Sequence, residues 1–109
     1  MQIYHLLIEG KPSITIEETQ EIGGAFVNVW VRATDRSTAK AEAINYLNAQ
    51  DWEVVNIIEE KRIVRRIRYI DVPESLECYD EAIHCGIGAL FHIWRSDAVD
   101  HDEDPRSNP

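Results

Sequence analysis

The amino-acid sequence predicts an α+β sandwich, in which two helices cover one face of a mixed sheet of four or five strands. Three observations predict it. The chain has 109 residues, 44% of them hydrophobic, which suffices for one modest core and not for two. The predicted elements follow in the order β, β, α, β, α, β. The connections around the first helix are only two or three residues long. We therefore expect a single domain over residues 1–96 and one sheet face without helices.

Two strands are predicted first. Ile3–Ile8 is a short apolar run that ends in a Gly and Pro turn. Residues 13–20 mix Ile-Thr-Ile with acidic side chains and are ambiguous. Ala25–Ala33 is the clearest strand, because its side chains alternate between two faces. One face carries Val27, Val29 and Val31, and the other carries Phe26, Asn28, Trp30 and Arg32.

A helix and a third strand follow. Asp35 or Ser37 can cap a helix over residues 36–50, since a short side-chain oxygen accepts from the free amides of a first turn. The apolar stripe of this helix consists of Ala39, Ala43 and Leu47. Trp52–Glu59 is apolar on both faces, which is typical of an interior strand. This order predicts a right-handed βαβ unit with two parallel strands.

The remaining segments complete the predicted fold. Residues 60–70 fit a strand or a helix, and we favour an extended structure. Glu74–Cys85 is predicted as a helix, with acidic residues in its first turn and Gly86 as its C-terminal stop. The apolar run Ala89–Trp94 gives the last strand. Together these elements predict a sandwich of the ferredoxin-like kind. Residues 97–109 are expected to be a disordered acidic tail.

Charge excludes several classes of partner. The formal net charge is −9, and residues 97–109 contribute −4 of it. Nucleic-acid phosphates and anionic lipids repel such a chain, so we expect neither nucleic acid nor membrane as a partner. The apolar runs are too short to span a bilayer. Because the start of the sequence does not resemble an export signal, a cytoplasmic location is the default expectation.

The two cysteines are expected to be free. Cys78 and Cys85 are seven positions apart in a predicted helix, where the rise of 1.5 Å per residue separates their Cα atoms by about 10 Å. A disulfide needs a separation within about 7 Å. Cys78 or Cys85 could act as a nucleophile with His84 or His92 as its base. The acidic surroundings would raise a thiol pKa, so we favour inert, half-buried thiols.

Acidic residues and a histidine share one face of the second predicted helix. Glu77, Glu81 and His84 lie at spacings of three and four, as does Asp80 relative to His84. Such a set could contribute to a metal site, but the apolar stripe lies elsewhere on the helix, so we favour a solvated face. His101 lies in the tail and lacks fixed geometry. We predict no metal, no cofactor and no catalytic residue.

Several segments resemble a known group of sequences. They are Val-Arg-Ala-Thr-Asp-Arg-Ser-Thr-Ala, Ala-Ile-Asn-Tyr-Leu, Asp-Trp-Glu-Val-Val, Cys-Tyr-Asp-Glu-Ala-Ile-His-Cys-Gly-Ile and Phe-His-Ile-Trp. Over residues 25–95 the chain resembles small bacterial proteins of unknown function. The resemblance implies a bacterial cytosolic origin and supports the fold. It implies no catalytic residue, because its motifs are structural: a helix cap, an alanine stripe, a tryptophan at the start of a strand and a glycine that ends a helix.

Basic residues concentrate in one short segment. Lys61, Arg62, Arg65, Arg66 and Arg68 are five of the eleven basic residues. Guanidinium groups bind carboxylate and phosphate, so the cluster could dock an acidic partner. The alternative, which we favour, is an edge strand kept soluble by charge, with its cations paired to Glu59, Glu60 and the acidic tail.

Two aromatic residues suggest how the protein acts. If the valines pack under the helices, Phe26 and Trp30 lie on the helix-free face, where His92 and Trp94 can join them. Such a face is typical of a partner surface. Alternatively, the segment around residues 14–16 folds over it.

We therefore predict a non-enzymatic interaction or regulatory module that forms a homodimer through its sheet, with Phe26, Trp30, Arg62, Arg65, Arg66 and Arg68 as its possible partner surface. One alternative is an immunity protein that neutralises a basic, nuclease-type toxin. A small-ligand binder or an enzyme is the third alternative. We rank it last because no set of nucleophile, base and oxyanion donors can be assembled from the sequence.

Overall fold

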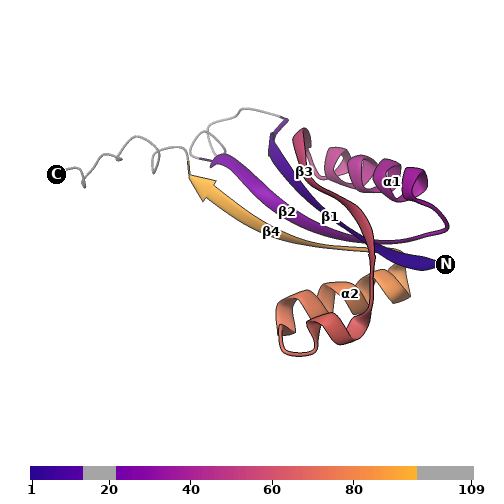
Figure 1. Cartoon of the computed structure of the whole chain (residues 1–109). Coiled ribbons are helices and arrows are strands. Elements are labelled where there is room, and N and C mark those ends of the chain that lie inside the picture. The colour runs from indigo at the N-terminus through magenta and orange to yellow at the C-terminus, as the bar shows by residue number, and fades with distance from the viewer. Residues whose placement is uncertain (14–21, 96–109) are drawn as a thin grey trace.

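The computed structural model describes residues 1–13 and 22–95. They form four strands, two α-helices and a short 3-10 helix, with both α-helices packed on the sheet (Figure 1). In chain order these are β1 (Gln2–Pro12), β2 (Ile22–Ala33), α1 (Arg36–Ala49), β3 (Trp52–Val64), the 3-10 helix η2 (Arg66–Tyr69), α2 (Pro73–Cys85) and β4 (Ile87–Arg95). The ambiguous stretch beyond Ser13 and the predicted tail lie outside the described residues.

The four strands form one antiparallel sheet in the order β3-β1-β2-β4. The α+β class with two helices is therefore confirmed, and it is compatible with a ferredoxin-like fold at this level. The predicted mixed sheet is not found, since β2 and β3 run in the same direction but β1 lies between them. The extended structure favoured for residues 60–70 continues only to Val64, and residues 66–69 then form η2.

The prediction that β3 is an interior strand is wrong, because β3 lies at an edge of the sheet. Its apolar residues on both faces have another cause. The register of β3 against β1 shifts three times. Val55 and Ile58 are extra residues at two of these shifts, so neither lies opposite a β1 residue, and both are exposed. An extra residue of this kind disturbs the alternation of faces along a strand.

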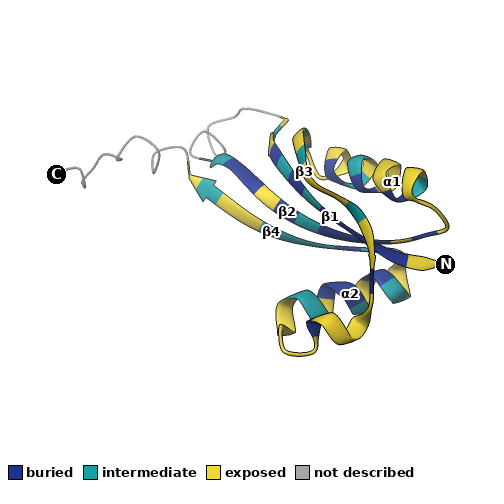
Figure 2. Cartoon of the chain, in the orientation of Figure 1, coloured by how far each residue is buried: buried dark blue, intermediate teal, exposed yellow. Residues whose placement is uncertain are grey.

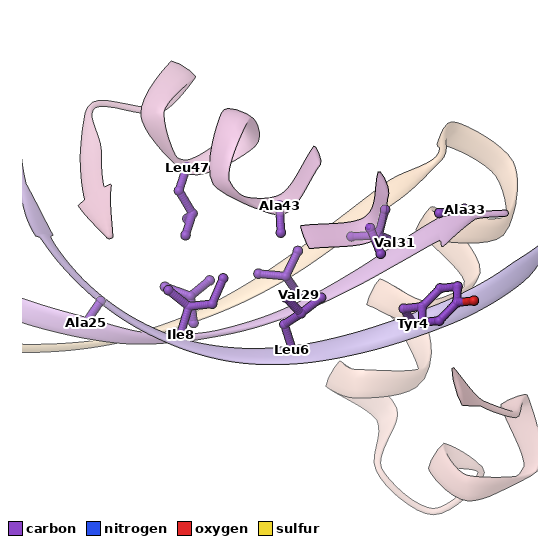
Figure 3. Packing of buried hydrophobic residues seen from close by; sticks show 11 residues of the cluster. Tyr4, Leu6, Ile8, Ala25, Val29, Val31, Ala33, Ala43 and Leu47 are labelled. Carbon is purple, nitrogen blue, oxygen red and sulfur yellow. The ribbon is translucent and has the colours of Figure 1, made fainter. Parts of the chain in front are cut away.

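Helix α1 packs on the face that the valines form, and we call this the α1-side face. The Asp35 carboxylate caps the helix, accepting a hydrogen bond from the Thr38 amide at 2.8 Å. Helix and strands meet through small or branched apolar side chains, all fully or nearly fully buried (Figure 3). They include Ala39, Ala43 and Leu47 from α1, Val27, Val29 and Val31 from β2, and Leu6 and Ile8 from β1.

Helix α2 packs on the opposite face, which corrects the prediction of two helices on one side (Figure 1). Its residues Cys78, Tyr79 and Ala82 contact Ile3 and Trp30. These strand residues alternate with those of the α1-side core and therefore point the other way. Helix α2 connects β3 at one edge of the sheet to β4 at the other, and it crosses the face that α1 leaves uncovered.

Two glycines fix the end of α2 against the sheet. Gly86 ends the helix with a φ of 99°, a left-handed conformation that favours glycine, as the sequence predicts. Gly88 lies against the backbone of Cys78, where a Cβ atom would collide with the carbonyl oxygen. The Arg32 guanidinium also donates to the Ile83 carbonyl at 2.6 Å. Helix α2 is thus held close to one end of its sheet face.

Candidate functional site

The α2-side face is divided into a covered part and an open part. Helix α2 and η2 bury the part around Ile3 and Trp30. No described helix covers the beginning of β2, where Phe26 lies, or the end of β4; Figure 2 shows exposed stretches there. The antiparallel register places His92 opposite Phe26 and Trp94 opposite Gly24. Residues that pair directly across strands share a face, so Phe26, His92 and Trp94 belong together. We call these three residues the open surface.

Trp30 does not belong to this surface, which corrects the expectation that its ring is exposed on a helix-free face. Only 1% of Trp30 is exposed, whereas Phe26 on the same strand and face is 43% exposed. The difference arises because α2, placed on this side of the sheet, covers Trp30. The alternative cover, the segment around residues 14–16, lies outside the described residues.

The open surface is held together by ring contacts. The Phe26 and Trp94 ring centroids are 4.8 Å apart with a tilt of 44°, a geometry that aromatic pairs prefer. The Trp94 ring lies directly over Gly24, where a Cβ atom would collide with it. Glycine at that position therefore lets the indole approach the β2 backbone beside Phe26. The pair is ordered by its own neighbours and still reaches the surface.

A second aromatic group, the buried ring cluster, lies under α2 and η2. It consists of His5, Trp30, Tyr69 and Tyr79. The His5 and Trp30 centroids are 5.1 Å apart, the Trp30 and Tyr69 rings meet edge to face at 5.5 Å, and the Tyr69 and Tyr79 centroids are 5.8 Å apart. Three buried polar atoms of this cluster have no hydrogen-bond partner in the described structure: His5 Nδ1, Trp30 Nε1 and Tyr69 Oη.

His5 is the titratable member at the centre of the sheet. Its Nε2 lies 2.8 Å from Asn28 Oδ1, and because an amide oxygen only accepts, Nε2 carries the proton. Burial lowers the pKa of His5 below 6.5; the hydrogen bond to Asn28 and the Glu59 charge oppose this, while the charges of Arg62 and Arg68 add to it. The neutral imidazole is favoured, but it is shielded from solvent and so is poorly placed to act on a substrate.

The basic residues of the predicted patch mostly pair with acids. Lys61 Nζ lies 2.9 Å from Glu60 Oε1, and Arg62 Nη2 lies 3.9 Å from Glu59 Oε1. These are the two acidic partners expected from the sequence.

Arg66 makes the best-formed pair, a two-pronged contact with Asp80 of α2. Nε donates to Oδ1 at 2.8 Å and Nη2 donates to Oδ2 at 3.0 Å. The hydrogen bond from Arg66 lowers the pKa of Asp80. Arg65 and Arg68 make no ion pair with any described residue and are exposed.

The acidic face of α2 and the Cys78 thiol show no reactive arrangement. No group of three or more metal-ligating side chains gathers within residues 1–13 and 22–95. Both cysteines are free, as predicted. Cys78 is buried, its Sγ lies 3.5 Å from the Ala89 carbonyl oxygen, and burial raises the pKa of its thiol. A thiol with a raised pKa is a poor nucleophile at neutral pH.

Comparisons with known proteins add no assignment: no family model, no curated protein and no solved structure matches this chain. The resemblance to small bacterial proteins therefore stays a prediction. In the described part of the chain, no helix is long and apolar enough to cross a membrane.

Sequence reasoning missed the role of His5 and Tyr69. One signal was available, since His5 is the only polar residue within the apolar run Ile3–Ile8 apart from Tyr4. A polar ring within a central strand suggests a partner on the covering layer. Tyr69 offered no comparable signal, because its contact with Trp30 depends on which face α2 covers.

Proposed function

We propose that this protein is a non-enzymatic interaction module that acts as a homodimer through its sheet. The observation that supports the proposal is the open surface, an ordered aromatic pair on a part of the sheet that no described helix covers. Aromatic side chains are enriched at protein interfaces because they bury a large area at a low cost in conformational entropy.

The chemistry of the described residues favours binding over catalysis. The thiol of Cys78 has a raised pKa, and the imidazole of His5 is buried beneath α2. A nucleophile needs a base within hydrogen-bond reach and access to substrate. Neither residue meets both conditions.

The size of the surface sets a requirement on the dimer. A stable interface buries about 800 Å² per partner. Two fully exposed aromatic rings would supply about 300–500 Å², and Phe26 and Trp94 supply less because both are already partly buried. Neighbouring side chains must therefore join the rings. Leu7 and Leu90 lie on the same face, are partly exposed and pair with Asn28 of β2.

The immunity-protein alternative depends on negative charge, and the described residues offer little of it. Residues 1–13 and 22–95 contain twelve acidic and ten basic side chains. Most of the net charge of −9 therefore belongs to residues 14–21 and 96–109. Capture of a cationic enzyme by an acidic surface has no specific support from the fold.

Sedimentation equilibrium of the full chain tests the proposed dimer. We expect a dimer at micromolar concentration, and a monomer with an unchanged circular dichroism spectrum for Trp94→Glu, because a carboxylate would have to be desolvated in the contact. Ile67→Glu is the control, since Ile67 lies on η2 and is 72% exposed. A parent chain that is monomeric at high micromolar concentration would contradict the proposal.

A further inference from the structure

The two edges of the sheet differ in how they are protected against pairing with another strand. Edge strands usually carry charged residues, proline or bulges that block further pairing. Edge strand β3 has both charges and bulges. Five of its thirteen residues are charged, and its register against β1 shifts three times. The charged residues of β3 are Glu53, Glu59, Glu60, Lys61 and Arg62.

Strand β4 lacks both protections over Ile87–Trp94, and its charged residue is Arg95 at its end. From Ile87 to Trp94 it contains no acidic residue, no lysine, no arginine and no proline. Its register against β2 is continuous from Gly24 to Val31. Among the described residues no strand lies beyond β4. Its outer backbone groups therefore form a regular, uncharged ladder edge.

The side chains at the end of β4 are apolar on both faces of the sheet. Ile93 pairs with Ala25, lies on the α1-side face and is 55% exposed. Trp94 lies on the α2-side face as part of the open surface. Apolar residues on both faces are typical of a strand that is covered on both faces. On β4 no bulge accounts for them, in contrast to Val55 and Ile58 of β3.

We propose that β4 pairs antiparallel with β4 of a second copy of this chain, joining two four-stranded sheets into one eight-stranded sheet. This inference rests on the proposed homodimer and assigns its interface to the β4 edge. Across the seam, directly opposed side chains would lie about 4.5–5.5 Å apart. The two open surfaces would then adjoin on one face, and the two Ile93 side chains would be covered on the other.

The occupant is a second copy because β4 is complementary to itself. Antiparallel pairing about a twofold axis covers both unprotected edges at once, as in an isologous interface. The outer edges of the resulting sheet are the two charged β3 strands, so assembly stops at two chains. A chain with a net charge of −9 also needs an uncharged contact to meet its own copy, and Ile87–Trp94 provides one.

Two matched substitutions test the edge contact by sedimentation equilibrium. Ile93→Lys places a charge on the β4 edge, and we expect it to weaken the dimer at least tenfold, because the lysine would be buried in the seam. Ile63→Lys is the control, since Ile63 is 48% exposed on the same face at the β3 edge. We expect Ile63→Lys to remain dimeric.

Spin labels provide a second measurement that does not depend on losing the dimer. In a Cys85→Ser background, which leaves the buried Cys78, labels at Ile93→Cys should lie close together across the seam. Labels at Ile63→Cys should lie at least about 34 Å apart, because seven strand spacings of 4.8 Å separate the two β3 strands. The distances between the labels test the β4 contact even if Ile93→Lys fails to fold.

The outcomes separate the two proposals. A monomeric parent overturns both. A dimer that survives Ile93→Lys and dissociates with Phe26→Glu, or that shows close labels at position 63, overturns the edge contact and leaves the proposed homodimer standing. A dimer that is lost with Ile93→Lys and retained with Ile63→Lys, with close labels at position 93 and not at position 63, supports both.

Discussion

The two faces of the sheet are built from the same strands but differ in the side chains that they bury and in how far a helix covers them. The α1-side core buries aliphatic side chains and one tyrosine, with alanines that let α1 approach closely. The α2-side core buries Trp30 next to His5 and Tyr69, and polar atoms of all three lack partners in the described structure. Beyond α2, no described helix covers the same face. The α1 side thus serves stability, whereas the α2 side combines stability with a surface available for contact.

Trp30→Glu should have the largest effect, because it attacks the covered part of the α2 side. Removing a buried tryptophan costs about 3–5 kcal/mol, and an unpaired carboxylate in its place costs more. Since whole domains are stable by about 5–15 kcal/mol, we expect an unfolded or nearly unfolded chain by circular dichroism. Phe26→Glu is the matched control on the same strand and face and should remain folded. If Trp30→Glu were folded and as stable as the parent chain, α2 would not cover this ring.

Leu47→Ala tests the α1 side. Leu47 is fully buried, so its truncation should lower the free energy of unfolding by about 3 kcal/mol through lost burial and a residual cavity. Leu76→Ala is the control from α2, because Leu76 is only partly buried against its core. We expect a clearly smaller loss for Leu76→Ala in urea titrations. Equal losses of unfolding free energy in the two variants would contradict the view that the α1 side is fully covered and the α2 side only partly covered.

The pH dependence of stability should reveal His5. Its pKa in the folded chain is lowered from 6.5, so between these two values the unfolded chain binds more protons. Stability is therefore complete above about pH 6.5 and falls as the pH drops towards the folded pKa. We expect His5→Gln to flatten this part of the curve of unfolding free energy against pH. A parent curve without this acid slope would contradict the assignment.

The Arg66 and Asp80 pair should give the smallest effect, because both groups are at the surface. A double-mutant cycle with Arg66→Ala and Asp80→Ala measures their coupling. We expect a weak favourable coupling that decreases towards about 1 M salt, where the screening length falls to about 3 Å. A coupling that is strong and insensitive to salt would indicate that η2 and α2 bury this pair in solution.

Local signals predicted the elements well. The Asp35 cap, the alanine stripe of α1 and the Gly86 stop each depend on a few neighbouring residues, and each is present in the structure. The alternation of β2 also separated its two faces correctly, with Val27, Val29 and Val31 on one side. The open surface followed in part, since Phe26, His92 and Trp94 do share a face.

Long-range features could not be predicted in the same way. Whether Trp30 is exposed depends on which face α2 covers, and nothing local to β2 or α2 specifies this. Val55 and Ile58 suggested an interior strand, because a sequence pattern does not distinguish burial on both faces from a bulge. His5 and Tyr69 belong to the same buried ring cluster although they are more than sixty positions apart in the sequence. A local pattern therefore cannot predict that their polar atoms are buried together.

The central position of β1 has a consequence for how the chain is made. β1 is paired on one side with β2, which follows soon after it, and on the other with β3, which ends only at Val64. At roughly 5–20 residues per second, a ribosome needs a few seconds to add the residues from Ala33 to Val64. During that interval the apolar run Ile3–Ile8 has no partner along its second side. The nascent hairpin is therefore at greater risk of wrong association than the finished protein, in which β3 covers that side.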